Sequence, residues 1–256
     1  MTKKLIKAIE KYVKDNIQKF HDSRIQALSI INVAKLLKKK NPYLYKVKNS
    51  EVASDLVKGI LDAHLSSSEE TMFGDWLEGL AIFINKMVYN GSKSSACGID
   101  LEFEKEGVRY LVCVKSGPNW GNSGQVKKMK DNFEAATITL KTSGSKIRVD
   151  AVNGCCYGTS KETLRVGNYY KICGQSFWTF ISGDENLYID IIKPLGSMAK
   201  ERNAEFIVKY EALLNKLTID FGKVYCNKNG SINWEKIVKL SCEKKKPSKR
   251  KTKSEV

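Results

Sequence analysis

The sequence predicts an α/β or α+β fold in which a mixed β-sheet is flanked by helices. Apolar residues recur at three- and four-residue steps through much of the first 88 residues, which predicts helices. The stretch 97–115 then reads as two apolar strands around a turn, a β-hairpin. Two more short apolar runs, 146–158 and 169–173, follow a helical pattern. This order of elements is typical of a helix-flanked sheet of roughly three to five strands.

The N-terminal region is predicted to be helical. One helix has lysines on one face and apolar side chains on the other, the apolar residues being Ile6, Ile9, Val13, Ile17 and Phe20. A second helix, from about residue 23 to Lys40, ends before Asn41-Pro42 because proline cannot continue a helix. Two further helices are expected at 50–65 and 69–88, since Ser66-Ser67-Ser68 before two glutamates is typical of a helix start.

Beyond the hairpin, the stretch 116–124 is too rich in Gly, Asn and Pro to be regular and predicts a loop. A helix from about 125 to 140 follows, with apolar residues on one face, namely Val126, Met129, Phe133, Ala136 and Leu140. After the two short strands the chain is predicted to be helical to about residue 217, with a last helix near 234–241.

The net charge of +16 is concentrated at the two ends of the chain. Residues 1–50 contain thirteen Lys and Arg against three acidic residues, and residues 241–256 contain seven against two, so the middle is nearly neutral. Basic segments suit a polyanion, with DNA or RNA ahead of an acidic membrane surface, although lysines also serve solubility alone. We therefore divide the chain into a basic helical region (1–49), a core with C-terminal helices (50–242) and a disordered basic tail (243–256).

Several classes of protein are disfavoured. No apolar run reaches the roughly 18 residues that a membrane span needs, and the lysine-rich start lacks the apolar segment of a secretory signal. We expect a cytoplasmic protein with no membrane partner. The seven cysteines include no CxxC pair and there are only two histidines, so a structural zinc site is disfavoured and reduced thiols are expected.

The hairpin carries an acid and a base at one end. Asp100 begins its first strand and Lys115 ends its second, and a lysine at the end of a buried strand is costly unless it reaches solvent or meets an anion. Metal-assisted phosphodiester hydrolysis needs carboxylates that hold the ion and a positive group beside the phosphate. Asp100 and Lys115 are therefore candidate catalytic residues, against the alternatives of a capping acid and a lysine that only snorkels.

These residues also carry a family resemblance. GID (98–100) followed by CVK (113–115) resembles the PD-(D/E)xK nuclease motif, in a variant with isoleucine before the first Asp. VKSGPNWGNSGQ (114–125), running into KKMKDNFEAA, resembles type II restriction endonucleases that read interrupted palindromes bounded by GG and CC. The resemblance extends from about Asn41-Pro42 to residue 183.

The resemblance implies a restriction-endonuclease-like core and a prokaryotic enzyme that cuts double-stranded DNA at a short palindrome with Mg²⁺ as cofactor. A palindrome presents the same half-site twice, so a homodimer is expected. Asp100 matches the metal-binding aspartate of the family and Lys115 its catalytic lysine.

The sequence departs from the motif at Cys113, where the family has Asp or Glu. A thiol is a poor ligand for Mg²⁺, so another segment must supply a carboxylate. We favour Glu78, on the helix before the hairpin, over Glu102, which lies a full pleat further along the Asp100 strand; Asp75 could assist. The expected metal-binding set is Asp100, Glu78 and Val114. The alternative for Glu78 is an exposed helix residue.

The loop and the helix start that follow Lys115 are the expected DNA-binding segment, because amide and hydroxyl groups reach base edges and phosphates. The candidate residues are Ser116, Asn119, Trp120, Asn122, Ser123 and Gln125. Each has a plainer alternative: loop asparagines make turns, Trp120 packs in the core, and Gln125 is a polar residue at a helix start.

The sequence thus favours a type II restriction endonuclease. A repair or junction-resolving nuclease with the same core is the alternative among enzymes, and a catalytically inactive basic DNA-binding protein is the alternative among binding proteins. The pair Asp100 and Lys115 separates them, because a protein that only binds has no need of both. An RNA-binding module would need an aromatic sheet motif that the sequence lacks.

Overall fold

The computed structural model describes residues 3–159, 164–196 and 199–244 and confirms the predicted fold class, a mixed sheet flanked by helices. Most of the predicted tail, residues 245–256, lies outside the described residues. By packing, the chain forms two compact units: unit 1 comprises Met1–Arg24 and Ser68–Ala204, and unit 2 comprises Ile25–Ser67 and Glu205–Val256. The division of the sequence at residues 49 and 242 follows charge and motif instead of packing, and it stays a prediction.

Unit 1 contains the sheet. Its strands are β1 (Ser92–Lys93), β2 (Leu101–Lys105), β3 (Val108–Lys115), β4 (Arg148–Cys155), β5 (Leu164–Val166) and β6 (Tyr169–Cys173), in the spatial order β1-β2-β3-β4-β6-β5. The predicted hairpin, β2 and β3, is antiparallel, whereas β3, β4 and β6 run parallel to one another. The sheet has six strands because β1 and β5, with two and three residues, add to its edges.

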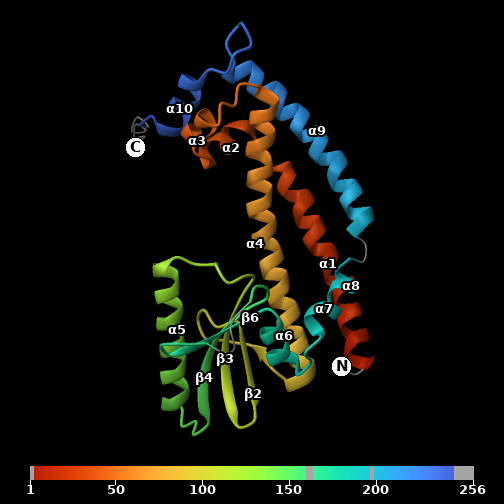
Figure 1. The fold of residues 1–256 in the computed structure, drawn as a ribbon, viewed down its shortest axis with the longest axis vertical. Coiled ribbons are helices and arrows are strands. Elements are labelled where there is room, and N and C mark those ends of the chain that lie inside the picture. Colours follow the sequence, from red (N-terminus) through yellow and green to blue (C-terminus); the bar gives the residue numbers. More distant parts are fainter. Residues whose placement is uncertain (1–2, 160–163, 197–198, 245–256) are drawn as a thin grey trace, which may run out of the picture. The chain divides into compact units, whose positions relative to one another are not determined.

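Helices cover both faces of this sheet (Figure 1). The helix α5 (Ser123–Thr142) packs on one face through Met129 and Phe133, against Leu111 and Cys113 of β3. On the other face, α4 (Ala53–Tyr89) and α6 (Gln175–Ser182) pack against apolar strand residues that include Leu101, Val112 and Val152. Leu77, Leu80, Ala81 and Ile84 of α4 are all buried in this core.

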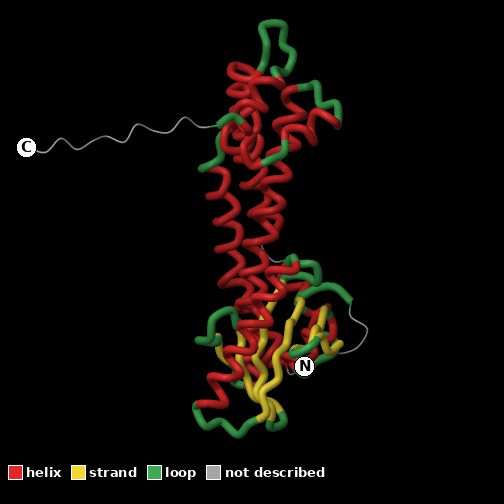
Figure 2. Tube along the Cα trace, turned by 90° about the vertical axis from the view of Figure 1, so that its left-hand side faces the viewer, coloured by secondary structure: helices red, strands yellow, loops and turns green. Residues whose placement is uncertain are grey.

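The remaining helices complete the two units. They are α1 (Lys3–Ser29), α2 (Val33–Lys39), α3 (Pro42–Val47), α7 (Leu187–Asp190), α8 (Ile192–Leu195), α9 (Ala199–Tyr225) and α10 (Trp234–Cys242). In the described part of unit 2 the regular elements are helices (Figure 2). Their core includes Leu56, Leu61 and Phe221. None of the helices that the structure describes is long and apolar enough to cross a membrane.

Three helices are longer than predicted: α1, α4 and α9, the last of which ends at Tyr225 and not near residue 217. Instead of breaking at the serine run, α4 continues without interruption, and the Ser67 hydroxyl donates to the carbonyl of Ala63 one turn earlier, as serines inside helices do. The first helix continues to Ser29 because its apolar face persists beyond residue 23, with Leu28 buried. The predicted helix end before Asn41-Pro42 is confirmed.

Candidate active site

Asp100 lies immediately before β2, beside the carboxyl end of β3. Its backbone N–H donates to the carbonyl of Val112 at 2.9 Å, which continues the hairpin ladder by one residue. The N–H of Val114 then donates to Asp100 Oδ2 at 2.7 Å. These two bonds hold the Asp100 carboxylate against the end of β3.

Lys115 is the last residue of β3 and meets that carboxylate. Its Nζ lies 3.7 Å from Asp100 Oδ2, and the Lys115 side chain is only 26% exposed. The ammonium also lies over the ring of Trp120, 5.3 Å from the ring centre. Burial disfavours the charged form of Lys115, but the neighbouring Cys113, Asp100 and Glu78 side chains outweigh that cost and raise its pKa. Lys115 is therefore a cation at neutral pH.

Glu78 approaches the same place from α4. Its side chain is 24% exposed, and Oε1 lies 3.4 Å from Nζ of Lys93 on β1. Burial and then the Asp100 carboxylate raise the pKa of Glu78, against the opposing effect of Lys93 and Lys115. Glu78 thus interacts electrostatically with Asp100 and Lys115, whereas Asp75, one turn earlier, is exposed.

Cys113 occupies the position of the missing motif acid. It is 3% exposed, and its thiol interacts electrostatically with the Asp100 and Lys115 side chains. Burial raises the pKa of Cys113 to about 11, so the thiol is neutral at physiological pH. The alternative acid, Glu102, accepts a hydrogen bond from the Ser94 hydroxyl instead of facing Lys115.

The donors present fit a hard divalent cation held by few protein ligands. Asp100 and Glu78 offer carboxylate oxygens, and Val114 can offer only its main-chain carbonyl. Because N–H and C=O of one strand residue point to the same side, that carbonyl faces the side on which Asp100 lies. Among the described residues no group of three or more His, Cys, Asp and Glu side chains is placed to hold a metal. Two carboxylates suffice for Mg²⁺ when waters and phosphate complete the shell.

The expected DNA-binding residues lie beside this site, and two of them have local partners. Asn122 caps α5 by accepting from the N–H of Gln125 at 3.0 Å, and Gln125 Oε1 accepts from the N–H of Asn122 at 2.9 Å. These oxygens start the helix, which leaves the amide NH₂ groups to reach outward. Asn119 and Ser123 are exposed.

Ser116 and Trp120 are only partly exposed. The Ser116 carbonyl accepts from the N–H of Tyr157 at 3.0 Å, and the Trp120 ring packs beside the α5 core while it carries Lys115.

Two lysines near the site were missed by the sequence analysis. Lys93 pairs with Glu78, and Lys171 on β6 donates from Nζ to the carbonyl of Pro118 at 3.0 Å, which ties the loop to the sheet. In sequence both are single lysines in short strands. Only the parallel register of β4 and β6 brings Lys171 beside Asn153 and so toward the loop.

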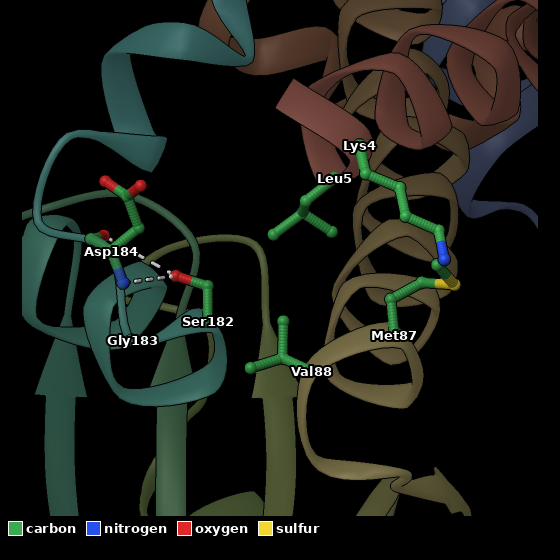
Figure 3. Close-up of a pocket in the computed structure, with 7 residues that line it drawn as sticks. All are labelled: Lys4, Leu5, Met87, Val88, Ser182, Gly183 and Asp184. Atoms are coloured by element: carbon green, nitrogen blue, oxygen red, sulfur yellow. Dashed lines mark hydrogen bonds between the residues drawn. The ribbon is translucent and has the colours of Figure 1, made fainter. Parts of the chain in front are cut away.

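A cavity of about 490 Å³ elsewhere in unit 1 carries no comparable chemistry (Figure 3). It is lined by Lys4, Leu5, Met87, Val88 and the turn Ser182–Asp184. The Ser182 hydroxyl donates to the Trp178 carbonyl at 2.6 Å and accepts from the N–H of Asp184 at 3.1 Å. Its oxygen therefore closes the end of α6 and is no free nucleophile.

A comparison with protein-family models gives a match over most of the chain. The protein-family model described as type II restriction endonuclease EcoO109I matches residues 7–203 of the 256. The matched region contains the whole sheet and the residues around Asp100 and Lys115. A search of curated proteins gives no significant match.

Proposed function

Because this chain belongs to the EcoO109I family of type II restriction endonucleases, and so is a nuclease that acts on DNA, we propose that Asp100, Lys115 and Glu78 form its active site. The observation that supports this most is the 3.7 Å ion pair between Lys115 Nζ and Asp100 Oδ2 at the end of β3. Glu78 of α4 adds a second carboxylate that interacts electrostatically with both. The reaction is hydrolysis of a phosphodiester bond in double-stranded DNA.

The two residues of the hairpin have different roles. Lys115, a cation held by Asp100 and Trp120, lies where it can contact a phosphate oxygen and stabilise the charge that develops on it. Asp100 is held by the N–H of Val114 through Oδ2, which leaves Oδ1 for a cation. Cys113, neutral and buried, fills the position of the motif acid without adding charge.

The cofactor in this proposal is Mg²⁺, held by Asp100, Glu78 and the carbonyl of Val114. When bound, the ion would activate water and neutralise charge on the phosphate. The two carboxylates face two ammonium groups, those of Lys93 and Lys115, so the protein side of the site is close to neutral. DNA phosphate and water therefore complete the coordination.

The substrate in this proposal is a short palindrome, an interrupted one bounded by GG and CC, and the active species is a homodimer with one site for each strand. The contacts to DNA come from Ser116, Asn119, Trp120, Asn122, Ser123 and Gln125. The basic region 1–49 wraps DNA or builds the dimer, the tail 243–256 adds non-specific affinity, and the enzyme acts in the cytoplasm of a prokaryotic cell.

Digestion of a plasmid of known sequence, with Mg²⁺ or with EDTA, tests the activity. A discrete set of fragments that requires Mg²⁺ is expected. A smear would indicate a non-specific repair-type nuclease, and an intact plasmid that is nonetheless bound would favour the inactive DNA-binding protein. The observation that favours the inactive DNA-binding protein is the neutral thiol of Cys113 at the position of the motif acid.

Substitution tests the site. Asp100→Ala and Lys115→Ala should each lower the cleavage rate by about 100-fold or more while DNA binding largely survives, since each removes charge that acts in the transition state. The matched controls are Glu104→Ala and Arg109→Ala, which break a 3.0 Å ion pair near the turn of the same hairpin and should cut normally. Cleavage within a few fold of wild type for either active-site variant would remove the assignment.

A further inference from the structure

The chain segment that follows β4 is fixed beside Lys115 from both sides. The carbonyl of Lys115 accepts from the N–H of Cys156 at 2.8 Å, and the carbonyl of Ser116 accepts from the N–H of Tyr157 at 3.0 Å. These bonds extend the β3–β4 ladder past the catalytic lysine. The backbone that carries Tyr157 is therefore in register with the proposed site.

The opposite side of this segment is anchored by α6 and the turn before it. The carbonyl of Cys155 accepts from the N–H of Gly174 at 2.9 Å. The carbonyl of Cys156 accepts from the indole N–H of Trp178 at 2.8 Å, and Trp178 is 2% exposed. Because breaking a buried hydrogen bond is costly, the segment has little freedom to move.

Two glycines pack against the same segment. A side chain at position 117 would collide with the ring of Tyr157, so the ring lies directly on the Gly117 backbone. A side chain at Gly158, which has φ +102, would meet the ring of Pro118 at 2.8 Å. The tyrosine thus stands on a close-packed rim that Gly117, Pro118 and Gly158 form beside the strand ends.

The Tyr157 side chain is 62% exposed even though its backbone is fixed. Trp120, the aromatic residue that the sequence singled out, is instead packed beside the α5 core under the Lys115 ammonium. A tyrosine held on a rigid backbone supplies contact area and a hydroxyl donor at a low entropic cost.

We propose that Tyr157 positions the DNA, its ring packing on the sugar–phosphate backbone next to the scissile phosphate and its hydroxyl donating to a phosphate oxygen. Tyrosine is one of the residues that contact DNA phosphates in this way, and such contacts fix register without reading sequence. The inference rests on the proposed function, because it places the scissile phosphate at Lys115.

The test uses the full-length protein and a short duplex centred on a cleavage position mapped on the plasmid. Binding is measured by fluorescence anisotropy with Ca²⁺ in place of Mg²⁺, over a range of salt concentrations. Tyr157→Ala should raise Kd by about 10-fold and Tyr157→Phe by about 3-fold, as expected for one neutral contact of this size. The slope of log K against log salt should stay that of wild type, because no charge is removed.

The control is Tyr188→Ala, which removes a partly exposed tyrosine from α7 and should leave Kd within twofold of wild type, a change of less than about 0.5 kcal/mol. The positions of cutting should be unchanged in Tyr157→Phe. The inference is overturned if Tyr157→Ala binds the duplex with the same Kd as Tyr188→Ala. It is also overturned if Tyr157→Phe has the Kd of wild type while Tyr157→Ala melts at a lower temperature, because the tyrosine would then serve folding and not binding. Failure of the wild-type protein to bind the duplex would overturn the proposed function as well.

Discussion

Cys113→Asp restores the acid of the family motif and should convert the protein into one that divalent metal stabilises. The residue is 3% exposed and interacts electrostatically with Asp100, so the new carboxylate would be repelled by an existing one. Two like charges about 4 Å apart interact by about 4 kcal/mol at an effective dielectric constant near 20. Lys115 offsets part of this, which leaves an expected loss of about 2–3 kcal/mol in the free energy of unfolding.

The assay is the melting temperature with and without Mg²⁺. A loss of about 2–3 kcal/mol lowers it by roughly 4–12 °C in a chain of this size. Metal present at about 100 times its dissociation constant returns about 2.7 kcal/mol, so Mg²⁺ should restore most of the lost stability. Wild type, whose two carboxylates already face two lysines, should respond much less.

Cys155→Asp is the matched control. Cys155 is fully buried and lies opposite Lys115 on β4, but neither carboxylate of the site is its strand partner. This variant should lose stability without recovery in Mg²⁺, and Cys113→Ser should cut DNA almost normally. An equal response of both Asp variants to Mg²⁺, or zinc-dependent cleavage that Cys113→Ser abolishes, would refute the reasoning.

Three other predictions concern the carboxylate of α4, the tail and the sheet. Glu78→Gln should lower the cleavage rate at least about 10-fold, and Mn²⁺ or a higher Mg²⁺ concentration should partly restore it. If the metal dependence of cleavage is unchanged, an acid other than Glu78 binds the metal. Deletion of 243–256 should weaken non-specific DNA binding, and the slope of log K against log salt should become less steep by about 0.9 for each phosphate that the tail no longer neutralises. Site-specific cleavage should persist at low salt. A truncated protein that binds but cannot cut would contradict this. Gly154→Ala would place a methyl group in the ring of buried Phe177 and should lower the melting temperature by an amount that corresponds to about 1–3 kcal/mol. Gly222→Ala, which has open space around it on a helix, should not lower it. Equal melting curves would show that the sheet can shift to accommodate the methyl group.

The hairpin was predictable because local chemistry determines it. Its turn contains Glu106 and Gly107, both with positive φ, between two strands of strong apolar pattern. Once that turn is placed, the antiparallel register alone brings Asp100 opposite the end of β3. The continuity of α4 was not predictable in the same way, because a serine run that resembles a cap becomes helical when the helix on both sides is buried.

The site divides along the same line. Asp100 and Lys115 are close in sequence, so one local motif predicts both, and the family resemblance adds Glu78 on the helix before the hairpin. The roles of all three residues stay predictions. Tyr157 has no such signal. In sequence it ends the apolar run CCYG, where a tyrosine reads as one more strand residue. Its exposure arises from three distant segments, since β3 provides the ladder, α6 anchors the carbonyl of Cys156 and a glycine of the loop makes room for the ring. A side chain that distant segments hold at the surface leaves no periodic pattern, so a role such as the one proposed for Tyr157 can be inferred only from the placement of the strands.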